Sequence, residues 1–350
     1  MKHSNQQGQV IPIATAEQQP LPPSTVETEF VEVYQEDVND EALEADQCHF
    51  IESNTSSVKR SDLSNDLVPS FATGELVISN SQFIDAVEMA MKDAFCGQSF
   101  GLPSIRCSHQ IRGRKSESLH KDPKTLTDND YSRFWQRMCF CIEVISQTRT
   151  INGEPVRLTI GGTTSLHDVN LYSKRSCQHY SVFVAWKCRV CSNLMIQLED
   201  GLLDQISCMN VSEIYTASAQ LFSRFNYEQS LRNLESLGQV SISANQFATL
   251  IGKLRLLSCM PIAEKKALLN IEIGDAQTLA ACRNFINGHF GLNGRDYING
   301  FELLNCFNDA VKNSYIHNFC SKNANCVTLA EGVCNSILGT DHTYDWFLES

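Results

Sequence analysis

The feature that most constrains the fold is a change of hydrophobic pattern at Asp200-Gly201. Before it, several stretches are rich in Val, Ile, Phe, Tyr and Cys, which is the composition of β-strands. After it, apolar residues recur every three or four positions, which is the spacing of one face of a helix. The predicted strands span residues 105–112, 138–145, 156–160, 180–188 and 194–198. A block of strands followed by a block of helices predicts an α+β fold.

Local signals order these elements further. Asn152-Gly153 between two apolar stretches favours a hairpin, here with a loop wider than two residues, so we expect a central antiparallel β-meander of about four or five strands. Ser79 and Gln82 have the spacing of a capping box and predict an N-terminal helix. Thr127 with Asp130 predicts a short helix that continues through Arg137. The C-terminal helices are expected at 210–225, 243–259, 262–269, 275–286, 300–311 and 325–338.

Residues 1–66 differ from the rest in composition, with Gln-rich and Pro-rich stretches and few large apolar residues. They contain 13 Asp and Glu against 3 Lys and Arg, which accounts for nearly all of the net charge of −12. Such a segment cannot bury enough apolar surface to offset its conformational entropy. We therefore predict a disordered acidic leader at 1–70, a helix plus sheet at 71–200, and a helical region at 201–350 that packs on the sheet or forms a subdomain.

The folded part separates its charges along the chain. Residues 101–191 carry 14 Lys and Arg against 7 Asp and Glu, whereas residues 192–350 carry 10 against 16. Local charge decides whether a phosphate backbone is attracted, so the acidic isoelectric point of 5.2 does not exclude nucleic acid.

The 15 cysteines do not indicate a disulfide scaffold. The N-terminus has no apolar signal-peptide core, and many cysteines lie among apolar residues, where a free thiol packs as a small hydrophobe. No apolar stretch approaches the roughly 18 residues that cross a bilayer. We expect a cytoplasmic protein with reduced cysteines and no membrane partner; the sequence does not specify an oligomeric state.

Candidate metal and redox sites are weak. Cys188 and Cys191 have the spacing of half a zinc site, but no second pair accompanies them, so a structural role is favoured. Cys139 and Cys141 alternate along a strand, and thus face one side as packing residues. We predict no metal and no cofactor.

Candidate catalytic motifs are also weak. Gly161-Gly162 lacks the Lys-Ser/Thr of a phosphate-binding loop and is interpreted as a strand-ending turn. His167-Asp168 could supply a base and its orienting acid, yet no nucleophile accompanies it, so a loop pair is favoured. The sequence therefore assigns no catalytic residue and favours a protein that is not an enzyme.

Several short segments of the sequence resemble those of a family of Bacteroidetes proteins catalogued as a domain of unknown function. The resemblance covers residues 79–332 and is carried by the segments 105–109, 111–114, 158–162, 170–174 and 315–316. The segment 189–194 is also similar to a broader family of phage/plasmid-like proteins, although Thr164-Ser165-Leu166-His167-Asp168 departs from that family's pattern. Membership would imply a gene carried by mobile genetic elements and no known activity.

The distributed cations and aromatics of the central region carry the strongest functional signal. Cations that follow a phosphate backbone, beside aromatic rings that stack on bases, are typical of single-strand DNA or RNA binding. A solvated basic face above buried aromatics explains the same residues. The candidate nucleic-acid-binding residues are Arg106, Arg112, Arg114, Lys115, Arg133, Trp135, Arg137, Tyr172, Lys174, Arg175, Lys187 and Arg189.

Three functional hypotheses follow. The first is nucleic-acid binding, for example to single strands during recombination or annealing. The second is a non-enzymatic module that binds a host or element-encoded protein, which predicts an exposed apolar or acidic patch within 200–350. The third is a metal-dependent nuclease, which requires acids or histidines that converge only in three dimensions.

Overall fold

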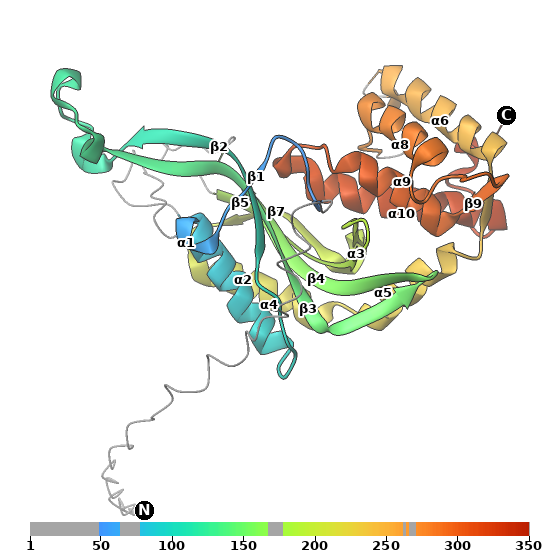
Figure 1. The fold of residues 1–350 in the computed structure, drawn as a ribbon, viewed down its shortest axis with the longest axis horizontal. Helices are drawn as coiled ribbons and strands as arrows, with labels where there is room; N and C mark the ends of the chain where they lie inside the picture. The colour runs from blue at the N-terminus through green and yellow to red at the C-terminus, as the bar shows by residue number, and fades with distance from the viewer. Residues whose placement is uncertain (1–48, 64–77, 167–177, 262–263, 266–270, 350) are drawn as a thin grey trace, which may run out of the picture. The chain divides into compact units, whose positions relative to one another are not determined.

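The predicted strands form one antiparallel sheet in a computed structural model, which describes residues 49–63, 78–166, 178–261, 264–265 and 271–349. The order of its strands is β1-β2-β3-β4-β5-β6, with β7 also paired to β5 (Figure 1). All described residues belong to one compact unit, Glu36–Ser350. The strands are β1 (Ser56–Ser57), β2 (Ser104–Arg114), β3 (Tyr131–Ile151), β4 (Glu154–Ser165), β5 (Gln178–Cys188), β6 (Leu194–Ile196) and β7 (Leu202–Cys208).

The α+β class and the antiparallel meander are confirmed, but the number of strands is not. The described part of the sheet has seven strands rather than four or five. β1 consists of two exposed serines that pair with Cys107 and Arg106, so it has no apolar signal. In β7 only the first and last residues, Leu202 and Cys208, are buried. This strand therefore has no clear alternation of buried and exposed residues. Backbone pairing, and not side-chain pattern, makes these two segments strands.

The predicted helix from Thr127 to Arg137 is wrong. The capping box of Thr127 and Asp130 does form, but it closes a single 3-10 turn, η4 (Asp128–Asp130). Tyr131 then begins the 21-residue strand β3, which pairs with β2 along its first half. A cap determines where a helical turn starts and does not determine how far the helix continues. Here pairing with β2 determines the conformation after the first turn.

The hairpin at Asn152-Gly153 is confirmed, and its loop is tighter than predicted. Ile151 pairs with Glu154, which leaves two residues in the turn. Asn152 and Gly153 have φ values of 50° and 86°, the left-handed conformation that a type I′ turn requires at both positions.

The helices begin where their capping signals are. Ser79 forms the predicted capping box with Gln82, Ser243 forms one with Gln246 where the helix at 243–259 was expected, and the Asn210 side chain accepts a hydrogen bond from the backbone of Glu213. No described helix is long and apolar enough to cross a membrane. The helix predicted at 262–269 lies largely outside the described residues. The helices are α1 (Arg60–Leu63), α2 (Asn80–Ala94), α3 (Leu198–Gly201), α4 (Val211–Arg224), α5 (Tyr227–Leu237), α6 (Ala244–Cys259), α8 (Asp275–Asn287), α9 (Gly300–Val311) and α10 (Phe319–Leu338).

The short elements complete the C-terminal half. β8 (Ser241–Ser243) and β9 (Tyr297–Asn299) form a small separate sheet between helices. Two 3-10 turns, η5 (Ile316–Asn318) and η6 (Asp345–Phe347), flank α10. The η5 turn directly precedes α10 and lies against β3 and β4, so the C-terminal half contacts the centre of the sheet.

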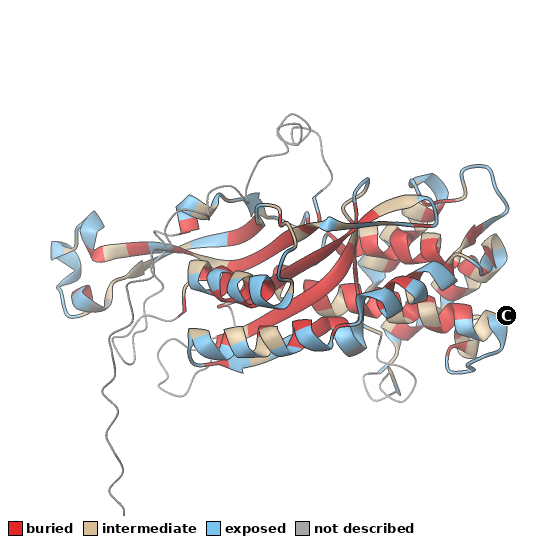
Figure 2. Ribbon diagram, turned by 90° about the horizontal axis from the view of Figure 1, so that it is seen from below, coloured by how far each residue is buried: buried red, intermediate tan, exposed pale blue. Residues whose placement is uncertain are grey.

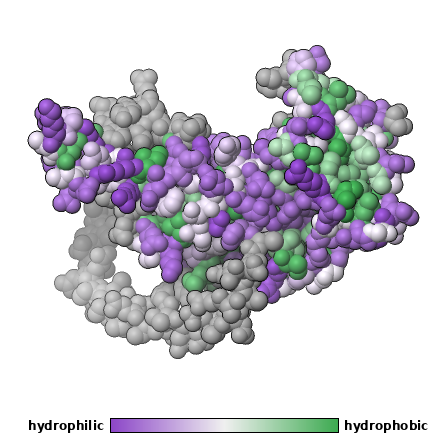
Figure 3. All heavy atoms as spheres, turned by 45° about the horizontal axis from the view of Figure 1, so that its top comes forward, coloured by the Kyte–Doolittle hydropathy of each residue, from purple (hydrophilic) through white to green (hydrophobic). Residues whose placement is uncertain are grey.

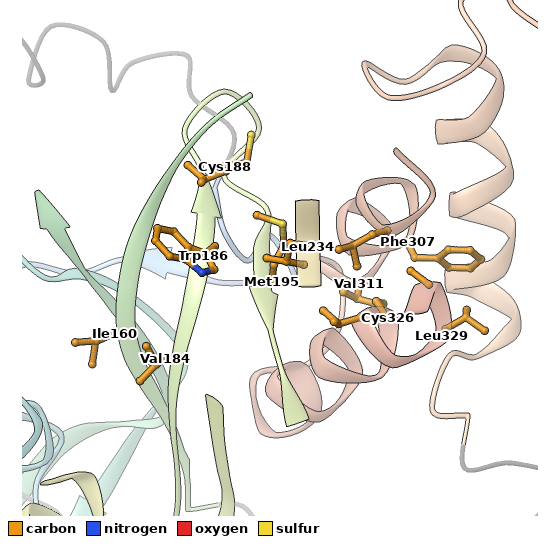
Figure 4. Packing of buried hydrophobic residues seen from close by; sticks show 14 of the residues in the cluster. Ile160, Val184, Trp186, Cys188, Met195, Leu234, Phe307, Val311, Cys326 and Leu329 are labelled. Carbon is orange, nitrogen blue, oxygen red and sulfur yellow. The ribbon is translucent and has the colours of Figure 1, made fainter. Parts of the chain in front are cut away.

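Buried residues follow one another along the strands of the sheet (Figure 2), and they belong to two hydrophobic cores. One face belongs to the main core, which includes α2 and α4 and extends into the C-terminal helices; Figure 4 shows it from Trp186 through Met195 to Phe307. The other face belongs to a second core, in which Cys139, Cys141 and Phe183 pack with residues of the α10 start. Phe50 and Ile51 also belong to this second core. Residues 1–48 and 64–70 of the predicted leader lie outside the described residues.

Gly161 and Gly162 do not end a strand, as the sequence had suggested, and lie inside β4. A Cβ atom on Gly161 would lie 2.2 Å from the Phe140 carbonyl oxygen and 2.5 Å from the Phe183 ring. On Gly162 it would lie 2.7 Å from the Phe83 ring. The glycine pair therefore lets aromatic rings approach the strand from both faces, which excludes a phosphate-loop role for it.

We expect Gly161→Ala to lower the free energy of unfolding by about 1–3 kcal/mol, because the added methyl group overpacks the second core. Urea denaturation with a two-state fit measures this change. Gly252→Ala is the matched control, because Gly252 lies in α6 with open space around its Cβ position. That control should be stabilised by about 0.5–1 kcal/mol, and equal effects of the two variants would contradict the packing argument.

Candidate nucleic-acid interface

The ends of β2 and β3 form a two-stranded ribbon, here residues 110–114 and 131–135 (Figure 1). Arg112 pairs with Arg133, and Arg114 pairs with Tyr131. Residues opposite one another, and residues two apart along a strand, share one face of a ribbon, so the three arginines lie together. Arg112 and Arg133 are exposed and Arg114 is half-buried. This end of the molecule is largely hydrophilic in Figure 3.

The facing arginines are an unfavourable arrangement for stability alone, because like charges directly opposite repel. Arg112 is partly neutralised by Asp128, with 2.5 Å between Nη2 and Oδ1, and its guanidinium stacks 4.0 Å from the Tyr131 ring. No carboxylate lies within 4.0 Å of Arg133 among the residues that the structure describes. The ribbon face therefore keeps net positive charge in contact with solvent.

The ribbon tip, residues 115–130, is organised around the buried carboxylate of Asp130. It accepts hydrogen bonds from Lys121, Ser118 and Thr127, at 2.5–2.9 Å. The bond from Lys121, followed by those from Ser118 and Thr127, holds the pKa of Asp130 well below its usual range. Asp130 therefore remains charged at neutral pH, and Lys121 is used to hold the tip.

Arg106 and Arg137, also predicted to bind nucleic acid, lie at the base of the ribbon and are buried. Arg106 donates from Nε to the Thr55 hydroxyl and from Nη2 to the Thr55 carbonyl, and its burial lowers its pKa. His109, between the ribbon and this pair, has a φ of 59°, and the pairing of β2 with β3 keeps the same register on both sides of it. The two buried arginines therefore differ from the ribbon arginines in their burial and not in strand register.

Lys187 is also committed to internal contacts. Glu143 accepts from Arg157 Nη1 at 2.7 Å and from Lys187 Nζ at 2.8 Å, and Arg157 Nε also donates to Thr148. The side chains of Arg157, Lys187 and Glu143 are 9%, 15% and 24% exposed. Burial alone would raise the pKa of Glu143, but the two cations outweigh it and the pKa is lowered. In this triad one carboxylate pairs with two cations, and the Lys187 ammonium is largely unavailable to a ligand.

The remaining candidates are dispersed. Trp135 is half-buried and packs against the main core, so it does not offer a free stacking face. Arg189 is exposed in the turn after β5, and Lys115 is half-buried at the ribbon tip. The structure thus groups Arg112, Arg114, Lys115 and Arg133, and leaves the others apart. Tyr172, Lys174 and Arg175 lie outside the described residues.

The cysteine pair predicted to be structural consists of Cys188, the last residue of β5, and Cys191, in the turn before β6. A hydrogen bond from Cys191 lowers the pKa of Cys188 to about 6, although burial opposes this. The buried Lys312 donates from Nζ to the Cys191 carbonyl and pairs with Asp309 at 3.1 Å, which fixes the turn against α9. Both thiols are free, and no three His, Cys, Asp or Glu side chains of the described residues lie together as a metal site.

Sequence analysis missed two aromatic residues near the candidate surface. Tyr315 and His317, on either side of buried Ile316, stack with ring centroids 5.8 Å apart. The guanidinium of Arg137 lies 5.7 Å from the Tyr315 ring centroid. No sequence signal connects Arg137 with Tyr315, because the two residues are far apart in the chain. Tyr315 and Ile316 nevertheless form one of the short segments that carry the family resemblance.

The fold and surface define a class: an α+β protein with an antiparallel sheet, buried side chains on both of its faces, and a basic two-stranded ribbon at one end. The chain belongs to the family described as "Domain of unknown function, B. Theta Gene description (DUF3871)", whose model matches residues 33–348. This confirms the expected membership in a family of unknown function. Neither the search of curated proteins nor the search of solved structures found a match.

The Glu143 triad predicts how stability depends on pH. Because the folded-state pKa of Glu143 is depressed, its stabilising effect is present above the unfolded value of about 4.3 and is lost as pH falls through the folded value. We expect Glu143→Gln to lower the free energy of unfolding at pH 7 by on the order of 2 kcal/mol.

Urea denaturation between about pH 7 and pH 3 measures this difference for both proteins. The difference between the wild type and Glu143→Gln should shrink as the pH falls through the lower end of that range. A difference that stays constant over the whole range would contradict the depressed pKa.

Proposed function

We propose that this protein binds nucleic acid, that it is not an enzyme, and that the basic ribbon face holds the backbone of a single strand. The observation that carries the proposal is the pairing of Arg112 with Arg133 beside Arg114 on one face. An unpaired cation at an exposed surface gains little for folding, whereas several on one face attract phosphates and release their counterions.

The geometry of the ribbon supports this use. A two-stranded antiparallel ribbon that extends beyond the body of a sheet can lie along a nucleic acid, as the strands of known β-ribbon readers do. Residues 109–137 carry seven Lys and Arg against four Asp and Glu, so the segment as a whole is basic. Asp130 holds the ribbon tip together, so the cations are presented on an ordered segment and less entropy is lost on binding.

A role in phage or plasmid biology, such as recombination or annealing, is part of the proposal and depends on sequence resemblance. The segment Arg189-Val190-Cys191-Ser192-Asn193-Leu194 is similar to phage/plasmid-like proteins. Its arginine is exposed at the end of β5, so it could also contact a backbone phosphate.

A protein-interaction module remains the second candidate. Leu256, Leu279 and Ile286, on α6 and α8, are exposed, and large exposed apolar side chains that lie close together are typical of protein-binding surfaces. The titration below separates the two candidates, because an apolar interface does not predict salt-dependent binding to DNA.

The test is fluorescence anisotropy of labelled single- and double-stranded oligonucleotides with the full chain across a salt series. Each phosphate contact to a single strand contributes about 0.7 to the slope of log affinity against log salt. We expect the variant Arg112→Gln/Arg133→Gln to bind more weakly and to reduce the magnitude of that slope by about 1.4.

The matched control is Arg224→Gln/Arg283→Gln, which removes the same charge from exposed positions on α4 and α8. This control should retain nearly all of the affinity and of the slope. Equal losses in the two variants would indicate a non-specific charge effect. Failure of the wild-type chain to bind DNA or RNA at about 50 mM salt would contradict the proposed function.

A further inference from the structure

Arg137 is buried and has no carboxylate partner among the residues that the structure describes. Its side chain is 7% exposed, and among the described residues no Asp or Glu lies within 4.0 Å of its guanidinium. Nη1 lies 3.3 Å from His109 Nδ1, and the buried Nε has no hydrogen-bond partner. A buried cation is unfavourable unless an anion or several acceptors compensate for its lost hydration. Three other cations of this sheet, Arg106, Arg157 and Lys187, each have such a partner.

Tyr315 lies beside this guanidinium and remains 57% exposed. The backbone of Tyr315 is held in place, because Ile316 is buried in the second core and the Asn318 N–H donates to the Tyr315 carbonyl at 3.1 Å. His317 lies nearly parallel to it, with 13° between the ring planes. A large aromatic ring is thus held at the surface in a fixed position, next to a cation that has no counter-ion within the described part of the chain.

We propose that Arg137, Tyr315 and His317 form a subsite for one nucleotide, in which the base stacks on the exposed surface of Tyr315 and the phosphate pairs with the Arg137 guanidinium. A phosphate satisfies guanidinium donors that His109 leaves without a partner. Base stacking on an aromatic ring needs no particular base, which suits sequence-tolerant binding. Because a nucleotide joins its base and phosphate through one sugar, a single ligand reaches both groups.

This inference rests on the proposed function, since the nucleotide belongs to the strand that the ribbon holds. Arg137 pairs with Ser108 on β2, directly before the residues that continue into the ribbon. A strand bound along the ribbon can therefore extend from Arg112 and Arg133 to the subsite. The ribbon attracts the backbone, and the subsite orders one nucleotide of it.

The test uses the full chain and a single-stranded oligonucleotide that contains 2-aminopurine, whose fluorescence is quenched when the base stacks. We expect wild-type protein to quench the fluorescence and Tyr315→Ala to abolish the quenching and weaken binding roughly five- to a hundredfold. Tyr315→Phe should retain both effects, because it keeps the ring. Tyr297→Ala is the matched control, since Tyr297 on β9 is 53% exposed and distant in the fold from Arg137.

Arg137→Gln tests the phosphate contact. The substitution should reduce the salt slope by about 0.7 while leaving the thermal unfolding midpoint equal to or above that of the wild type, because it removes an uncompensated buried charge. A large loss of thermal stability together with an unchanged slope would show that Arg137 is a structural residue, and would overturn the subsite.

The remaining outcomes separate this inference from the proposed function. If the ribbon variant weakens DNA binding while Tyr315→Ala binds like the wild type, the subsite is wrong and the proposed function stands. If the wild type binds no strand, titration with adenosine monophosphate at millimolar concentration tests whether the subsite exists by itself. Binding of this nucleotide that is lost in Tyr315→Ala would support a site for free nucleotides. No binding of either ligand overturns the subsite as well as the proposed function.

Discussion

Nine consecutive residues of β4, Val156–Thr164, are buried, because side chains from other parts of the chain pack on both faces of the sheet there. Tight packing from both sides requires Gly161 and Gly162 at the places where aromatic rings meet the strand. It also requires that the cation of Arg157 be compensated inside the sheet, which Glu143 does. The charge triad and the glycine pair are two consequences of one packing constraint.

The same constraint separates the basic residues into two groups. Where the sheet is covered, cations are matched by Glu143, by Thr55 or, for Arg137, by a single histidine contact. Beyond His109 the ribbon continues past the covered region, and its arginines face solvent. An exposed cation keeps its hydration and remains able to exchange counterions for phosphates, whereas a paired and buried one does not. The extent of coverage therefore separates the hydrated arginines of the ribbon from the buried cations, among which Arg137 has no carboxylate partner within the described residues.

Sequence reasoning succeeded where the controlling interactions are local. The caps at Ser79, Asn210 and Ser243 and the turn at Asn152-Gly153 each depend on neighbours within a few residues. It failed at Tyr131, where the local cap was real but β2 supplied partners for a strand. It also failed for Gly161, because the Phe140 carbonyl oxygen and the Phe183 ring, which require a glycine there, belong to β3 and β5.

The sequence by itself determined the α+β class, several helix caps and the hairpin turn at Asn152-Gly153, and a central region rich in cations, since these follow from residue spacing and composition. The tertiary structure alone decided that Arg112 and Arg133 face each other, that Lys187 pairs with Glu143, and that Tyr315 lies beside Arg137. These are contacts between residues distant in the chain. Strand register and packing bring them together, and neither is encoded in the local pattern around any one of them.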